Sequence, residues 1–430
     1  MLLGSILTST GQSSLAASIS LRSYLLVSPE PSGPRQIVLE FPDIKLNHTW
    51  EIDSLPFAAF ADPAKAKHFD DRLTSLDAEL VAALEPHIAT VSTHLPEKAR
   101  HQHHAAASCF LYLLLSLGSP AMPGCAYTMR STIPIGAGLG SSASISVCLA
   151  TAILLQNSHI AQPSSPSSSP HTLDTINAWA FVGEICIHGT PSGVDNTVAT
   201  KGRAVLFKRT ISPNSPPQPP TVTPLHDFPT LPLLLVDTRQ PRSTAALVAS
   251  VGQLYKAHPT VVGPLLDAID ACTEEAHALL ASSSSPSSAT TTSTPSPETL
   301  HTLGTLVQLN QSILSTIGVS HPKLERVREL VEAHNVGWTK LTGAGGGGCA
   351  IVLLKPEGTA EMRRAVEKEL EAAGFGIYET VLGGKGVGLA GAGNGSNREV
   401  FRDARGSEEV EKLVGVGGGN GGDRMWRFWD

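Results

Sequence analysis

The sequence predicts an α+β protein with two domains. Its 430 residues exceed what one hydrophobic core usually serves. In some stretches apolar residues occupy every second position, as in strands, and in others they recur every three or four residues, as in helices. Ser/Pro-rich tracts at 162–170, 212–220 and 282–297 interrupt both kinds, and we expect disordered surface loops there because such compositions cannot bury apolar surface. The middle tract predicts a domain boundary near residue 225, with domains at 1–225 and 226–390.

The first half contains mixed secondary-structure signals. Apolar alternation and flanking turn residues predict strands at 16–27, 36–41, 49–52, 125–131 and 203–208. Helical spacing, or apolar runs without Gly or Pro, predicts helices at 70–84, 105–117, 145–156 and 173–187. The strand at 125–131 leads into a glycine-rich loop, and the helix at 145–156 follows that loop.

The second half has a more regular pattern. Strands are expected at 231–237, 337–341, 349–355 and 375–382. Helices are expected at 244–258, 261–280, 298–317, 322–334 and 359–373. This order predicts an antiparallel sheet backed by helices, roughly ferredoxin-like. The chain then becomes Gly-rich and later charged, so we expect residues 391–430 to form a loose tail.

Composition excludes several classes of protein. The 31 basic and 38 acidic residues give a net charge of −7, which argues against a nucleic-acid-binding surface. The longest apolar run, 105–117, is too short to cross a bilayer. Six cysteines without a C-x-x-C pair are expected as buried free thiols. We therefore expect a cytoplasmic enzyme without a membrane or nucleic-acid partner, and leave a homodimer open.

The glycine-rich loop runs from Pro134 to Ala143. Glycines at alternate positions let backbone N–H groups converge on an anion, and the helix that follows adds its positive end. Serines at the start of that helix can cap it or ligate a cation held by a phosphate. A P-loop would need Lys where Ser141 stands. We interpret the loop as a triphosphate cradle; taken alone, a tight turn before a buried helix would be the better interpretation.

Other motifs accompany this loop. Its P-x-x-x-G-L-G-S-S-A pattern resembles the nucleotide-binding motif of GHMP small-molecule kinases, and the stretches 188–196 (HGTPSGVDN), 237–244 (DTRQPRST) and 340–349 (KLTGAGGGGC) resemble the mevalonate kinase family. The resemblance runs from about residue 14 to residue 382. It implies an N-terminal domain like ribosomal protein S5 and a ferredoxin-like C-terminal domain. It also implies ATP- and Mg²⁺-dependent phosphorylation of the 5-hydroxyl of mevalonate, in isoprenoid and sterol biosynthesis.

Phosphoryl transfer to an alcohol requires a held triphosphate, a cation and a proton acceptor. Asp195 lies on a Gly-anchored turn, and taken alone it would be better interpreted as an Asp capping a short helix; the resemblance favours Asp195 as the proton acceptor. The resemblance implies Glu184 and Ser142 as Mg²⁺ ligands, and the alternative for Glu184 is an exposed helix charge. A sparse shell of carboxylate, hydroxyl, phosphate and water suits Mg²⁺.

The resemblance also assigns the remaining contacts. Arg242, Thr244 and Ala344 are expected on the mevalonate side. The Arg242 guanidinium can hold the substrate carboxylate with two hydrogen bonds. The expected nucleotide contacts are Pro134, Gly136, Ala137, Gly138, Leu139, Gly140, Ser141, Ser142, Gly343, Gly345 and Gly346.

One family motif is not found. The family begins with a Lys followed by Gly-Glu-His, whereas no Lys precedes Lys45 here. We therefore expect a truncated or misassigned start, which leaves open whether the chain as given is active. Two alternatives also remain. One is another GHMP kinase, acting on phosphomevalonate, galactose or homoserine. The other is a catalytically impaired ligand-binding paralogue.

Overall fold

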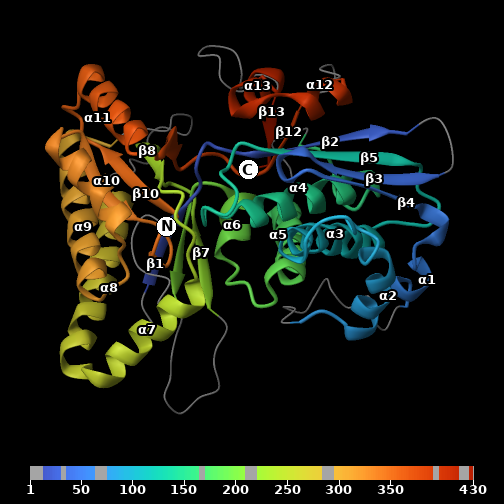
Figure 1. The fold of residues 1–430 in the computed structure, drawn as a ribbon, viewed down its shortest axis with the longest axis horizontal. Coiled ribbons are helices and arrows are strands. Elements are labelled where there is room, and N and C mark those ends of the chain that lie inside the picture. The colour runs from blue at the N-terminus through green and yellow to red at the C-terminus, as the bar shows by residue number, and fades with distance from the viewer. Residues whose placement is uncertain are drawn as a thin grey trace. The chain divides into compact units, whose positions relative to one another are not determined.

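The computed structural model describes residues 13–30, 35–62, 75–163, 170–208, 220–282, 295–390, 397–415 and 426–429. These residues form two compact units, each assembled from separate stretches of chain (Figure 1). Unit 1 takes the described residues of Met1–Ser20, Pro134–Leu139 and Gly202–Lys385. Unit 2 takes those of Leu21–Ile133, Gly140–Lys201 and Gly386–Asp430. The two units thus alternate along the chain, whereas the sequence predicted two domains divided by a single boundary near residue 225.

Unit 2 is built on a sheet of order β2-β5-β3-β4. Its strands are β2 (Ser23–Pro29), β3 (Gln36–Phe41), β4 (Leu46–Glu51) and β5 (Cys125–Ser131). Strands β3 and β5 are parallel, and the other neighbours are antiparallel. Before its C-terminal stretch, this unit contains the helices α1 (Phe57–Phe60), α2 (Ala78–Ile88), α3 (Glu97–Leu117), α4 (Ser141–Gln156), α5 (Pro170–His188) and α6 (Val194–Lys201).

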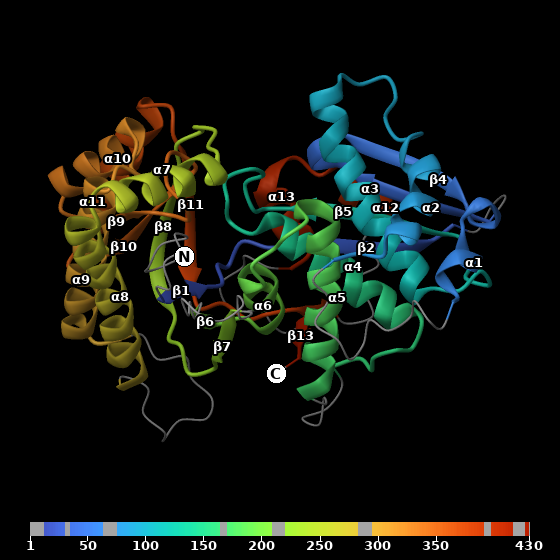
Figure 2. The ribbon, with the colours of Figure 1, turned by 90° about the horizontal axis from the view of Figure 1, so that it is seen from below.

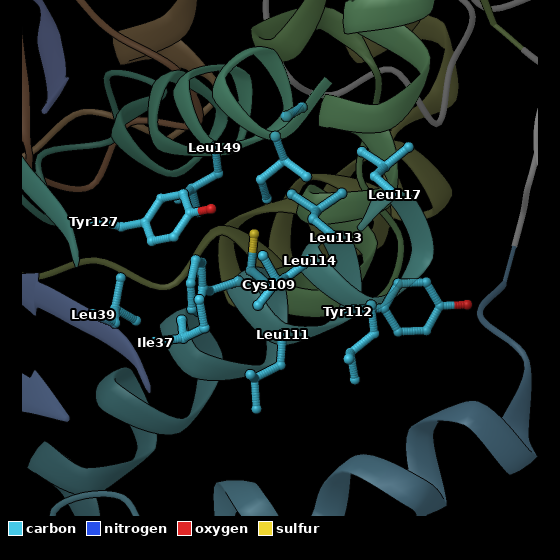
Figure 3. Close-up of a cluster of buried hydrophobic side chains, with 14 of the residues drawn as sticks. Ile37, Leu39, Cys109, Leu111, Tyr112, Leu113, Leu114, Leu117, Tyr127 and Leu149 are labelled. Carbon is cyan, nitrogen blue, oxygen red and sulfur yellow. The ribbon is translucent and has the colours of Figure 1, made fainter. Parts of the chain in front are cut away.

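The core of unit 2 lies between this sheet and helices α3, α4 and α5. Helix α3 carries the run Cys109–Leu115, whose side chains are almost completely buried. Figure 3 shows Cys109 and Leu114 of α3 packed near Tyr127 of β5 and Leu149 of α4. The helix ends where Gly118 donates its N–H to the Leu114 carbonyl at 2.8 Å. Helices α4 and α5, which carry the predicted metal-binding residues, are thus fixed on a rigid core.

The opposite face of this sheet is covered by the C-terminal segment (Figure 1). Helices α12 (Arg398–Asp403) and α13 (Gly406–Leu413) lie there, and β12 (Gly388–Ala390) pairs with β13 (Trp426–Phe428). Phe401 is 2% exposed and packs in one cluster with Tyr24 of β2. We expected a loose tail from residue 391; its described residues are instead folded, because Phe401 and Val410 supply an apolar face for the sheet to bury.

An ion-pair cluster also attaches this segment to the sheet. Arg398 donates through Nε and Nη2 to the Glu40 carboxylate at 3.0 and 2.8 Å, and through Nη1 to Glu30 at 2.6 Å. Glu40 is 3% exposed, so Arg398 neutralises a buried charge. Burial alone would raise the pKa of Glu40, but the hydrogen bonds from Arg398 and Thr128 lower it below its ordinary value.

Unit 1 contains the sheet β11-β8-β10-β9, antiparallel throughout. Its strands are β8 (Leu231–Asp237), β9 (Gly337–Leu341), β10 (Cys349–Leu354) and β11 (Gly376–Leu382). Its helices are α7 (Thr244–Ala257), α8 (Pro259–Ser282), α9 (Pro297–Thr316), α10 (Pro322–Ala333) and α11 (Ala360–Ala372). The strand order in chain sequence and in space is that of a ferredoxin-like sheet, as expected. Figures 1 and 2 show α8 to α11 on one side of it.

A second sheet of unit 1 has the order β1-β6-β7, with β1 (Ser13–Ala17), β6 (Ala204–Lys208) and β7 (Thr221–Leu225). We predicted one strand over 16–27. The structure has β1 and β2 there, in different sheets, separated by residues 18–22. This pairing of β1 with β6 is why unit 1 includes the start of the described chain.

Several expectations fall outside the described residues. Most of the three Ser/Pro-rich tracts, and residues 1–12, where the family's first motif was sought, lie outside them. Of the helix expected at 70–84, residues 70–74 lie outside the described residues, and α2 begins only at Ala78, where the Asp77 side chain caps it. None of the described helices combines the length and apolar character needed to cross a bilayer.

Candidate phosphoryl-transfer site

The glycine-rich loop connects the two units. Pro134–Leu139 belongs to unit 1, and Gly140 begins unit 2. Helix α4 then starts at Ser141, earlier than the predicted residue 145, without a side-chain cap on its first N–H groups. The N–H groups at the start of a helix can bind an anion. The predicted cradle therefore has the helix N-terminus that a phosphate site needs.

In unit 2, three of the predicted residues come together. Glu184 on α5 lies near the Ser142 hydroxyl at the start of α4, and the two share a hydrogen bond. Asp195 lies in the first turn of α6, beside the same loop. A Cβ placed on Gly140 would lie 3.3 Å from the Asp195 Cβ. The structure thus gathers Ser142, Glu184 and Asp195 at the N-terminal ends of α4 and α6.

Glu184 is not the exposed helix charge that the alternative interpretation required. It is 4% exposed, and burial raises its pKa to about 7, with the nearby Asp195 charge adding to the rise and the Ser142 hydrogen bond opposing it. Within the described residues its buried Oε1 has no hydrogen-bond partner. A buried carboxylate with an unsatisfied oxygen is suited to a cation.

His188 is a residue that sequence reasoning did not assign. It lies one helical turn after Glu184 at the end of α5, and its Nε2 is 3.0 Å from the Ser142 Oγ. Ser142 is therefore contacted by two α5 side chains at positions i and i+4. That spacing was visible in the sequence, because residues four apart on a helix share a face.

The position of Asp195 depends on its neighbours in α6. Asn196 is 2% exposed and donates to the Asn177 Oδ1 of α5 at 2.7 Å. The Thr197 hydroxyl donates to the Gly193 carbonyl at 2.7 Å and accepts from Asn177. These bonds attach the start of α6 to α5 while Asp195 itself stays exposed. The carboxylate is accessible yet held on a fixed backbone.

In unit 1, Arg242 lies against two glycine-rich segments. Its Nη1 donates to the Thr342 carbonyl at 2.7 Å. A Cβ on Gly138 would overlap the guanidinium, and one on Gly343 would lie 2.9 Å from Nη2. Gly138 also has a φ of +73°, which other residues rarely adopt. Glycine at position 138 is therefore required both by its backbone and by Arg242.

The segment Gly343–Gly348 connects β9 to β10 and is fitted to its surroundings. Gly345 has a φ of +84°, and a Cβ there would overlap the Val319 carbonyl. The next residue, Gly346, donates its N–H to that carbonyl at 2.8 Å. Gly348 donates to the Gln240 carbonyl at 2.9 Å. The turn is thus held by main-chain contacts that exclude side chains.

The two remaining substrate candidates differ in exposure. Thr244 is exposed as the first residue of α7, where Ser243 accepts the Ala246 N–H as the helix cap. Ala344 is 2% exposed. A metal site made only of protein side chains is not found: within the described residues no three His, Cys, Asp or Glu could together hold an ion. A cation at Glu184 would need hydroxyl, phosphate and water oxygens as well.

Comparisons with known proteins identify related domains in this chain. Residues 104–203 match the model for the GHMP kinases N terminal domain, and residues 297–372 match GHMP kinases C terminal. The first match includes Ser142, Glu184 and Asp195. The fold resembles the crystal structure of L. major mevalonate kinase in complex with R-mevalonate, with a TM-score of 0.59 over 90% of this chain and 94% of that one. Sequence identity there is 21%, so this likeness concerns the fold, which is the expected two-domain α+β GHMP kinase fold.

Closer relatives are found by sequence. The mevalonate kinase of Gibberella zeae is 50% identical over 97% of this chain and 84% of its own length. That of Aspergillus fumigatus is 51% identical over 97% of this chain and 78% of its own length. Identity at this level across nearly the whole chain shows that the protein belongs to the mevalonate kinase family.

Proposed function

We propose that this chain transfers the γ-phosphoryl group of ATP to the 5-hydroxyl of mevalonate. The observation that carries the proposal is the cluster of Ser142, Glu184 and Asp195 at a helix N-terminus, in a chain half identical to mevalonate kinases. The product would be 5-phosphomevalonate, in isoprenoid and sterol biosynthesis.

The residues present fit a divalent cation. Glu184 has a buried oxygen without a hydrogen-bond partner among the described residues, and the Ser142 hydroxyl contacts the same carboxylate. Glu184 and Ser142 would hold Mg²⁺, which when bound neutralises charge on the triphosphate. Both ligands lie on helices fixed by the core of unit 2.

The other residues of the proposed site would bind the triphosphate and mevalonate and accept the proton. Backbone N–H groups of the glycine-rich loop and the start of α4 would hold the triphosphate. Asp195 takes the proton from the 5-hydroxyl as that oxygen forms a bond to the γ-phosphorus. The bond from the γ-phosphorus to the bridging oxygen breaks, and ADP leaves with the electron pair. Arg242, Thr244 and Ala344 are proposed on the mevalonate side.

A substrate panel tests this function. We expect ATP-dependent phosphorylation of R-mevalonate with kcat/KM at least about 10³-fold above that for phosphomevalonate, galactose or homoserine. A poorly matched substrate leaves buried polar groups of the protein without hydrogen-bond partners, and this raises the free energy of its transition state. Preference for another of these alcohols would support a different GHMP kinase. Binding of mevalonate and ATP without turnover would support a ligand-binding paralogue.

A further inference from the structure

Glu325, a carboxylate outside the proposed site, is linked by hydrogen-bonded neighbours to the glycine turn Gly343–Gly348. Glu325 lies in the first turn of α10 and accepts hydrogen bonds from three hydroxyl or amide groups and one guanidinium. Its Oε1 accepts from the Ser320 hydroxyl, from the Ser315 hydroxyl at 2.7 Å and from the Gln311 amide at 3.3 Å. Its Oε2 accepts from the Arg328 Nε at 2.8 Å.

The first connection passes through the corner between α9 and α10. Ser320 follows Val319, whose carbonyl accepts the Gly346 N–H at 2.8 Å and occupies the space that a Cβ on Gly345 would take. Val319 is 1% exposed. Holding Ser320 therefore fixes the carbonyl against which the middle of the glycine turn rests.

The second connection passes through Gln311 on α9. Its Oε1 accepts the Leu341 N–H at 2.9 Å, and its Nε2 donates to Glu325 and to Ser315. Leu341 is the last residue of β9, two positions before Gly343. Gln311 is 3% exposed, so this bridge is shielded from water. Both the entry and the middle of the turn thus depend on one carboxylate.

The chemistry of Glu325 supports a fixed ionised hub. Burial alone would raise its pKa, but hydrogen bonds from Ser320, Ser315 and Arg328 lower it below the ordinary value. An ionised carboxylate accepts hydrogen bonds about twice as strong as a neutral acceptor does. Each hydrogen bond to Glu325 is therefore stronger than a bond between two neutral groups.

We propose that Glu325 is a positioning residue for the nucleotide, acting through Ser320–Val319 and through Gln311–Leu341 to hold the N–H groups of Gly343–Gly348 in place. The proposal rests on the assignment of this glycine turn to ATP. Glu325 touches no substrate group; it fixes the backbone donors that would.

The test compares Glu325→Ala with Glu325→Gln and with Glu329→Ala. Glu329 lies on the same helix, with a side chain 60% exposed and paired with Arg326 at 3.2 Å, so it is a matched control. We expect Glu325→Ala to raise the KM and Kd for ATP about tenfold, because loosely held donors bind phosphate less well. The KM for mevalonate should change less than about threefold. Glu325→Gln keeps an oxygen for the two hydroxyls and should recover most of the ATP affinity.

Two further variants separate the possible failures. Gly345→Ala moves the turn itself. If it leaves ATP affinity unchanged, the assignment of the turn to ATP is wrong. If Gly345→Ala weakens ATP binding while Glu325→Ala does not, or if Glu325→Ala raises both KM values equally, the positioning proposal is overturned. Should Glu325→Ala not fold, Ser320→Ala removes a single donor. We expect it to raise the ATP KM about threefold, and an unchanged value would overturn the proposal.

Discussion

Replacing Lys340 by methionine should stabilise the protein near neutral pH. Lys340 lies on β9 and is 0% exposed, and its Nζ donates to the Leu341 carbonyl at 3.0 Å. In the described part of the chain no carboxylate forms an ion pair with it. Burial lowers its pKa from 10.5 to about 7. A charged amine in this position has lost its hydration without gaining a counter-ion.

The size of the effect follows from that pKa. Each pH unit of difference between the folded and unfolded pKa is worth about 1.4 kcal/mol, so burying Lys340 costs about 4 kcal/mol at pH 7. Between pH 7 and the unfolded pKa, the unfolded chain holds a proton that the native chain has released. Stability of the native protein therefore rises with pH in this window, and the cost is fully present below it. By about pH 8.5 the cost should have fallen by roughly a third.

The assay is urea unfolding of wild type and Lys340→Met at about pH 7 and about pH 8.5. Higher pH is avoided, because burial raises the pKa of Cys109 and Cys148 to about 12, which lowers stability above pH 9. We expect the variant to be more stable by about 3 kcal/mol at pH 7, since the lost bond to the Leu341 carbonyl offsets about 1 kcal/mol. The advantage should shrink at pH 8.5.

A matched control is Lys368→Met, at an exposed position of α11 in the same unit. It should change neither the stability nor its pH dependence by more than about 0.5 kcal/mol. Equal pH slopes for wild type and Lys340→Met would show that Lys340 titrates as in the unfolded chain, and the reasoning from burial would be refuted.

Three further predictions concern the site and the C-terminal segment. Glu184→Gln should weaken Mn²⁺ or Mg²⁺ binding in the presence of nucleotide at least about tenfold in calorimetry, because a neutral amide replaces the ligand carboxylate; unchanged metal affinity would remove Glu184 from the metal site. Arg242→Ala should raise the KM for mevalonate more than that for ATP; a larger rise for ATP would mean that its contacts with the glycine segments are its main role. Arg398→Ala should destabilise unit 2 by about 2 kcal/mol in thermal unfolding, because the buried Glu40 then keeps only the Thr128 hydroxyl and the more distant Arg402; a change below about 0.5 kcal/mol would contradict this.

Much of the fold could be predicted from periodicity. Strands β3, β5, β8 and β9 match their expected ranges. Strands β3 and β8 are short and largely apolar, and β5 and β9 contain the aromatic and β-branched residues that favour strands. Helix α6 was considered only as the alternative interpretation of Asp195, since it is short and contains Thr and Asn, which have low helix propensity. It is held in place because Asn196 donates to Asn177 of α5, and Thr197 accepts from the Asn177 amide. Such tertiary support has no local sequence signal.

The candidate site, too, was predicted in part from the sequence and depends in part on tertiary packing. The family resemblance selected Ser142, Glu184 and Asp195, which the structure brings together in unit 2. It could not show that Glu184 is buried, which depends on the packing of α5 against α4. It also could not reveal Glu325, whose role rests on contacts between α9, α10 and a turn on β9. Their roles in the reaction stay predictions.

Asp195 is proposed to remove the proton from mevalonate's hydroxyl in an ATP-dependent phosphorylation. The most direct measurement compares kcat of the protein and of Asp195→Asn with ATP, Mg²⁺ and R-mevalonate, alongside the Kd for ATP. We predict mevalonate phosphorylation by the unaltered protein, a loss of about 10²–10⁴-fold in kcat for Asp195→Asn, and a nearly unchanged Kd for ATP. Turnover by Asp195→Asn within a few-fold of the unaltered protein would contradict the account.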